Sequence, residues 1–83
     1  MITVPDCQEF EVFRQNAEFV RVQIGLTQIQ LAERTEIAQT AISQYLSGKK
    51  EPRISTMARI ARGLGIPLRL LFDPDFRNLE IRA

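Results

Sequence analysis

Glycines and prolines divide this chain into short segments, and within each segment the apolar residues recur at three- and four-residue steps. That spacing places the apolar side chains along one face of an α-helix. Gly25 follows the first such stripe, as a glycine commonly follows the last residue of a helix. The residues of this stripe are Phe10, Phe13, Ala17, Val20 and Ile24. The chain is therefore predicted to be all-α, and its first helix is predicted to end near Gly25.

Two shorter helices separated by a turn are predicted to follow. Thr27 and Gln30 have the spacing of a capping box, in which the threonine hydroxyl accepts a backbone N–H and the glutamine side chain reaches back. The helix that they open is expected over residues 28–34. After a turn at residues 35–37, a third helix is expected over residues 39–46. This is the spacing of a helix-turn-helix.

A fourth and a fifth helix complete the prediction. Pro52 forbids a continuous helix through the loop at residues 49–53, and Ser55 is a suitable N-cap for the fourth helix. Pro67 suits the start of a fifth helical stretch that runs to Phe72. The apolar face of the fourth helix is expected to contain Met57, Ile60, Ala61 and Leu64.

The two ends of the chain have a different pattern. Apolar and polar side chains alternate at residues 2–4 and again at residues 79–81, as in short strands. With 83 residues, the chain is long enough for a single core. We therefore expect an N-terminal extension at residues 1–9, one domain at residues 10–72 and a C-terminal tail at residues 73–83.

The composition excludes several functional classes. The chain has no histidine and one cysteine, so it lacks the commonest general base, the ligands of a structural zinc site and the means to form an internal disulfide. It also lacks a glycine-rich phosphate loop and a paired nucleophile and base. We predict that it is not an enzyme and holds no metal or cofactor. Without a segment apolar enough for a membrane span or a secretory signal, it is expected to be cytoplasmic.

The charged residues are distributed unevenly. Residues 1–36 contain three arginines and six carboxylates, whereas residues 37–72 contain six basic residues and a single glutamate. The positive charge is densest in the loop at residues 49–53. Such an asymmetry suggests that this part of the fold faces a polyanion. The alternative is an ordinary solvated surface.

The third predicted helix has an unusual outward face. Ile42 and Tyr45 are expected to face the core, with Ala41 partly inward, so the remaining positions face solvent. Those positions hold neutral hydrogen-bonding residues in place of the usual lysine and glutamate, namely Gln39, Thr40, Ser43, Gln44 and Ser47. Glutamine can donate and accept at once, as the edge of adenine in the major groove requires. This favours base recognition over a merely solvated polar helix.

Several short motifs occur in a fixed order between residues 10 and 72. They are Arg21, Gly25-Leu26-Thr27-Gln28, Leu31-Ala32, Ile37-Ala38-Gln39, Ile42-Ser43, Gly48, Pro52, Ile60-Ala61 and Leu64-Gly65-Ile66. In this order and spacing they resemble the Cro/repressor (XRE) type of helix-turn-helix domain, as found in the lambdoid phage repressors. The resemblance implies a compact five-helix bundle of the lambda-repressor-like DNA-binding type, with short N- and C-terminal extensions.

The resemblance also implies which residues contact DNA. In the family, the third helix enters the major groove by its N-terminal end, and the second helix lies across the sugar-phosphate backbone. The base-reading positions correspond to Gln39, Thr40 and Gln44, with Ser43 between them. The phosphate-binding positions lie at the start of the second helix, at the end of the third and in the basic loop. They correspond to Gln28, Ser47, Lys49, Lys50 and Arg53.

Three positions depart from the family pattern. Glu36 stands where the family prefers glycine, and a left-handed conformation there would cost on the order of 1 kcal/mol. Ala38 stands at the N-cap of the third helix, where serine or threonine would contribute roughly 1 kcal/mol. Leu46 replaces a glutamate that often pairs with the arginine at the position of Arg21. Arg21 therefore needs another partner or must stay solvated.

The predicted function is sequence-specific binding of double-stranded DNA by a transcriptional regulator, with a repressor as the first candidate. A homodimer would place its two third helices in successive major grooves of a near-palindromic operator. One alternative is the antitoxin of a toxin–antitoxin pair, with a toxin bound by residues 1–9 or by the tail. Another is a protein-interaction module without DNA binding, which the small net charge favours and the basic loop opposes.

Two further groups of residues are not assigned to the DNA-binding site. Arg59, Arg62 and Arg69 are interpreted as solvated, with an extension of the DNA surface as the alternative. In the tail, packing within the domain or across a dimer interface is expected of Phe76, Leu79 and Ile81.

Overall fold

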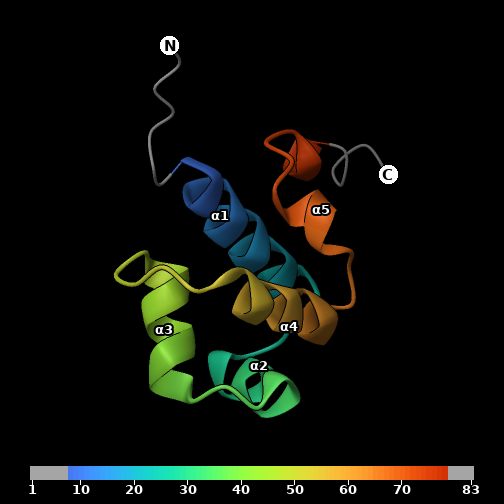
Figure 1. Cartoon of the computed structure of the whole chain (residues 1–83). Coiled ribbons are helices and arrows are strands. Elements are labelled where there is room, and N and C mark those ends of the chain that lie inside the picture. Colours follow the sequence, from blue (N-terminus) through green and yellow to red (C-terminus); the bar gives the residue numbers. More distant parts are fainter. Residues whose placement is uncertain (1–7, 79–83) are drawn as a thin grey trace.

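The computed structural model describes residues 8–78, and this part of the chain folds into helices around one core. The helices are α1 (Gln8–Gln23), α2 (Gln28–Thr35), α3 (Gln39–Ser47), α4 (Ile54–Leu64) and α5 (Leu68–Leu71). Residues 76–78 are helical as well. Figure 1 shows α2 and α3 at one end of the molecule, with α1 and α4 crossing above them and α5 at the opposite end. The all-α prediction is confirmed, and the expected strands at residues 2–4 and 79–81 lie outside the described residues.

The apolar stripe of α1 is confirmed except at its last member. Phe10, Phe13, Ala17 and Val20 are buried, but Ile24 is 48% exposed. The prediction for Ile24 was wrong because α1 ends at Gln23 and the chain then reverses at Gly25, whose φ is +78°. Leu26, beyond the reversal, is buried instead.

The start of α2 matches its prediction. The backbone N–H of Gln30 donates to Oγ1 of Thr27 at 3.0 Å, and Oε1 of Gln30 accepts from the backbone N–H of Thr27 at 2.9 Å. Both halves of the capping box are therefore formed. The helix continues to Thr35, one residue beyond the expected end.

The start of α4 differs from its prediction. Arg53 is the N-cap, in an extended conformation and without a side-chain capping bond, so Ser55 lies inside the first turn. The prediction of Ser55 as the cap was wrong because the chain enters the helix directly after Pro52, which is buried. The expected apolar face is confirmed, since its four members are all buried: Met57, Ile60, Ala61 and Leu64.

The segment after α5 packs against α1. Asn16 is fully buried in α1, and its Nδ2 donates to the backbone oxygens of Leu71 and Asp73, both at 2.9 Å. Phe76 is also buried, with 5% of its surface exposed. Its expected role in packing is confirmed within the domain, whereas Leu79 and Ile81 lie outside the described residues.

A close contact between α2 and α4 depends on Gly63. A Cβ atom on Gly63 would lie 2.7 Å from Cγ2 of Thr35. Thr35 is buried, and its hydroxyl donates to the backbone oxygen of Leu31 at 2.9 Å. Because a β-branched side chain held in this way has little freedom about χ1, its methyl group cannot turn aside. The absence of a side chain at Gly63 therefore sets the separation of the two helices.

We expect Gly63→Ala to lower the free energy of unfolding by about 1 kcal/mol, because overpacking costs about 1–3 kcal/mol and outweighs the roughly 1 kcal/mol gain in helix propensity. Thr35→Ser removes the obstructing methyl group and keeps the hydroxyl. In that background Gly63→Ala should be neutral or stabilising. Urea denaturation of the four proteins measures the difference, and equal destabilisation in both backgrounds would contradict this account of the contact.

Candidate nucleic-acid interface

The turn between α2 and α3 consists of Glu36, Ile37 and Ala38. Glu36 has a φ of +60°, so the residue that stands where the family prefers glycine does adopt the left-handed conformation. The backbone N–H groups of Glu36 and Ile37 both donate to the oxygen of Ala32, which closes the end of α2. Ala38 is the N-cap of α3 and makes no side-chain capping bond. These contacts hold the two helices at the spacing of a helix-turn-helix.

Arg59 of α4 binds the turn from the side. Its Nη2 donates to the backbone oxygen of Thr35 at 2.6 Å and to that of Glu36 at 3.2 Å. The last carbonyls of a helix have no partner within the helix, so Arg59 satisfies acceptors that the turn leaves open. The interpretation of Arg59 as a solvated side chain was wrong, since it is half-buried and fixes the approach to α3.

Arg14 of α1 binds the opposite end of α3. Its Nη1 donates to the backbone oxygen of Leu46 at 3.2 Å. Glu11 holds the same guanidinium, with Nε of Arg14 donating to its Oε1 at 3.0 Å. The hydrogen bonds from Arg14 and from Gln15 lower the pKa of Glu11 below its usual range. Sequence reasoning missed Arg14, because its acceptor on α3 is a backbone oxygen and has no signature in the sequence.

Arg21 finds a partner within its own helix. Its Nη2 lies 2.6 Å from Oε2 of Glu18, and its Nη1 donates to the backbone oxygen of Leu26 at 2.6 Å. The hydrogen bonds that Arg21 donates to Glu18 raise the pKa of Arg21. Leu46, which stands where a glutamate often occurs, is buried in the core with 4% exposed. The departure at Leu46 thus adds apolar packing and leaves Arg21 paired.

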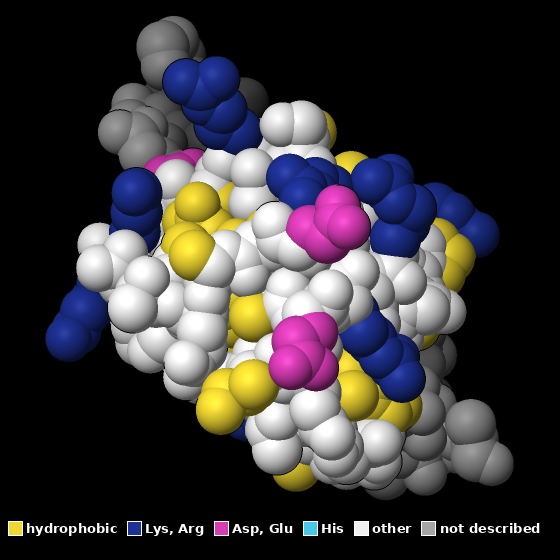
Figure 2. Space-filling model, turned by 90° about the horizontal axis from the view of Figure 1, so that it is seen from below, with side chains coloured by type: hydrophobic (Ala, Val, Ile, Leu, Met, Phe, Trp, Pro, Cys, Tyr) yellow, Lys and Arg dark blue, Asp and Glu magenta, His cyan; other side chains and the backbone are white. Residues whose placement is uncertain are grey.

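The outward face of α3 is open to solvent. Ile42 and Leu46 are buried and Tyr45 is half-buried, while the polar positions between them are exposed: Gln39, Thr40, Ser43, Gln44 and Ser47. Figure 2 views the molecule from the end that carries α2 and α3. It shows a surface that is neutral over much of its area, with most of the basic side chains toward its edges and acidic side chains near its middle. The predicted base-reading residues therefore share one accessible face.

The predicted phosphate-binding residues flank this face. Gln28 is the first residue of α2 and is half-buried, and Lys49, Lys50 and Arg53 are exposed in the loop that follows α3. The backbone N–H groups of Lys49 and Lys50 donate to the oxygen of Gln44 at 2.9 and 3.2 Å, so the loop is attached to the last turn of α3. Over residues 8–78, both ion pairs lie in α1 and leave these cations unneutralised.

A family model described as Helix-turn-helix matches residues 19–71, from the end of α1 to the end of α5. The chain belongs to the Cro/repressor (XRE) type of helix-turn-helix regulators. This is a family of DNA-binding transcription regulators, so the resemblance seen in the sequence is confirmed. Among the described residues, the helix-turn-helix itself comprises α2, the turn at residues 36–38 and α3.

A solved structure has the same fold as this helix-turn-helix protein. It is the crystal structure of a hypothetical transcription factor, NHTF, from Neisseria, with a TM-score of 0.78 and 24% sequence identity. The match covers 98% of this chain and 94% of that one. No curated protein matches the sequence.

None of the helices at residues 8–71 is long and apolar enough to cross a membrane. The same part of the chain contains no group of three or more side chains that could hold a metal ion.

Proposed function

We propose that this helix-turn-helix protein is a transcriptional repressor that binds a near-palindromic operator as a homodimer in the cytoplasm, without enzymatic activity. The proposal rests on one observation. The exposed face of α3 is neutral and polar, and it ends at a loop of unpaired cations. Phosphate contacts supply most of the affinity of a DNA-binding protein, whereas contacts with base edges supply its specificity. This surface offers both kinds of group side by side.

The base-reading groups are Gln39, Thr40 and Gln44, with Ser43 beside them. Glutamine can pair with N6 and N7 of adenine in a bidentate manner, and threonine can contribute a hydroxyl or a methyl group. Gln39 and Thr40 form the first turn of α3 and Gln44 lies one turn later. Entry of the N-terminal end of α3 into the major groove would bring all three to base edges.

The phosphate-binding groups are Gln28, Ser47 and the loop cations Lys49, Lys50 and Arg53. The hydroxyl of Ser47 donates to the backbone oxygen of Gln44 at 3.3 Å and retains its capacity to accept. The three cations would supply the sequence-independent attraction. Because the loop is attached to the last turn of α3, its charges keep a defined position relative to the base-reading face.

Two subunits would double the base contacts without new chemistry. Their α3 helices would lie about 34 Å apart, one turn of the duplex. Selection of bound sequences from a random DNA pool tests binding, symmetry and half-site spacing together. A protein-interaction module would select nothing. An antitoxin would select an operator and, in addition, would bind a toxin.

Gln39→Ala and Gln44→Ala are each expected to cost about 1–3 kcal/mol of operator binding and to relax the preference at one base pair. Lys49→Ala should weaken binding to operator and to random DNA alike, since a phosphate contact does not depend on sequence. Competition binding measures, for each variant, the ratio of its affinity for operator to its affinity for random DNA. Equal losses on operator and random DNA for all three variants would remove the base-reading assignment.

A further inference from the structure

An open cavity of about 410 Å³ lies between the C-terminal end of α2 and the last two turns of α4. None of its lining residues belongs to α3, although one of them, Glu36, lies in the turn that leads to that helix. Six residues line it: Arg34, Thr35, Glu36, Arg59, Arg62 and Gly63. Three of the six are arginines, and a single carboxylate accompanies them.

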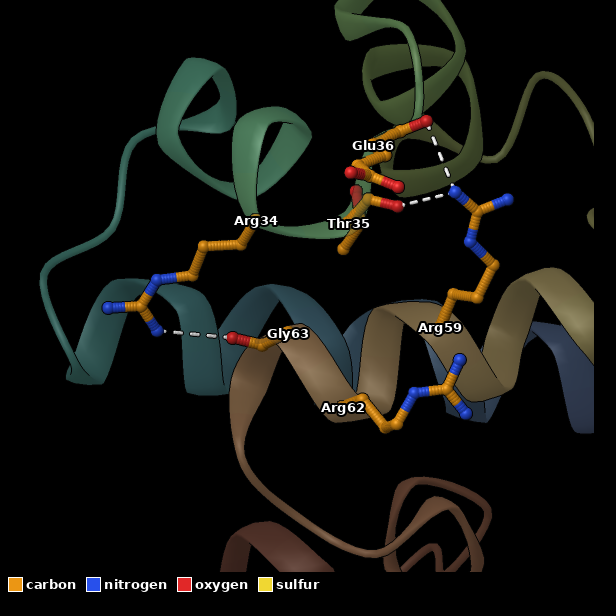
Figure 3. A pocket seen from close by; sticks show the side chains of 6 residues that line it. All are labelled: Arg34, Thr35, Glu36, Arg59, Arg62 and Gly63. Carbon is orange, nitrogen blue, oxygen red and sulfur yellow. Dashed lines mark hydrogen bonds between the residues drawn. The ribbon is translucent and has the colours of Figure 1, made fainter.

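Two of these arginines cross the rim of the cavity, and each is anchored there by hydrogen bonds to backbone oxygens on the far side. Figure 3 shows Arg34 reaching from α2 to the backbone oxygen of Gly63 on α4, a distance of 3.2 Å. Arg59 reaches in the other direction, from α4 to the oxygens of Thr35 and Glu36. Each of these bonds uses a terminal nitrogen, and a guanidinium has five N–H donors. Both side chains are therefore held in place with donors to spare.

The third arginine has no such role. Arg62 is exposed and projects from α4 beside Arg59, and none of the hydrogen bonds within residues 8–78 involves its side chain. Neither ion pair of the described chain includes any of the three arginines. The three positive charges of the lining exceed the single negative charge of Glu36, so their placement around a concave space favours an anion.

We propose that this cavity binds phosphate groups. The planar guanidinium matches two phosphate oxygens at once and is weakly hydrated, which makes arginine the preferred residue for this recognition. The volume lies within the range of small-ligand sites, but the lining lacks the apolar side chains that such sites usually have. A ligand with several negative charges therefore fits better than an apolar one. Either a free phosphorylated small molecule or the DNA backbone could supply the phosphate.

The first arm of the test uses the free protein, so its outcome does not depend on DNA binding. Sodium pyrophosphate is added at constant ionic strength while amide signals are followed by NMR. We expect saturable shifts at Thr35, Glu36 and Gly63, with a Kd on the order of 1 mM or tighter. Arg62→Ala should raise that Kd about tenfold, as expected for the loss of one hydrogen bond to a charged group. Arg69→Ala removes the same charge from an exposed position on α5 outside the cavity and should leave the Kd unchanged.

The second arm measures the salt dependence of DNA binding for the same variants. If the phosphate is supplied by DNA, Arg62→Ala should reduce the slope of log K against log salt by about 1 for each subunit relative to Arg69→Ala. Saturation by pyrophosphate that Arg62→Ala weakens, with no change in the slope, would assign the cavity to a free ligand. An absence of both effects, or equal effects of the two variants, would overturn the proposal.

Discussion

Raising the salt concentration from 50 to 200 mM is expected to weaken operator binding by about 10³-fold or more. Lys49, Lys50 and Arg53 are exposed and unneutralised in each subunit, so a dimer would contact at least six phosphates with them. Each neutralised phosphate adds about 0.9 to the slope of log K against log salt. A further contribution from Gln28 or Ser47 would not change the slope, because these side chains carry no charge.

Titrations at several salt concentrations, with fluorescently labelled operator, give this slope directly. Lys49→Ala should reduce it by about 2 in the dimer, one for each subunit. Lys49→Arg keeps the charge and should preserve the slope. A slope near zero for the unmodified protein would contradict the assignment of the loop to the DNA backbone.

Asn16→Ala is expected to lower the free energy of unfolding by about 2–4 kcal/mol, the largest stability effect that we anticipate for a polar residue. The amide of Asn16 is the donor to the backbone oxygens of Leu71 and Asp73. Without it, the oxygen of Leu71 is left unpaired next to the core, at about 1–3 kcal/mol for a buried group, whereas the oxygen of Asp73 still accepts from the backbone N–H of Phe76. The removed side chain also leaves unfilled volume in the core, which adds to the cost. In a domain of this size the melting temperature should fall by roughly 10 °C or more.

Gln15→Ala is the matched control, since Gln15 is the neighbouring amide on α1 but is only half-buried. It accepts from Arg77 and donates to Glu11 near the surface, so its loss should cost less than about 1 kcal/mol. Asn16→Leu separates the two contributions of Asn16, because it restores the volume without the donors. Similar values for Asn16→Ala and Gln15→Ala, in thermal and urea denaturation, would show that the buried hydrogen bonds contribute little.

The features predicted from the sequence were mostly those that depend on neighbouring residues. The capping box of Thr27 and Gln30 and the apolar face of α4 both follow from local spacing, and both were confirmed. The error at Ile24 shows the limit of periodicity. A stripe can continue in the sequence after the helix has ended.

The contacts that hold the candidate site could not be predicted. Arg14 binds a backbone oxygen 32 residues away along the chain, and Arg59 binds two that are 23 and 24 residues away. Asn16 binds two backbone oxygens that are 55 and 57 residues away. A backbone oxygen is present at every residue, so the sequence does not indicate which one an arginine or asparagine will reach. The contact at Gly63 is similar, because its significance depends on how closely α2 approaches.

The attachment of α3 at both ends determines which partner must adapt in a complex. Arg14 of α1 holds the last turn of α3, and Arg59 of α4 holds the loop that leads from α2 into α3. A tilt of α3 alone would strain the bond of Arg14 to Leu46 at one end and the turn that Arg59 holds at the other. In the proposed complex, little conformational entropy would be lost on the protein side, and adjustments of bend and groove width would fall to the duplex. Base pairs that the protein never touches would influence affinity through the stiffness of the DNA.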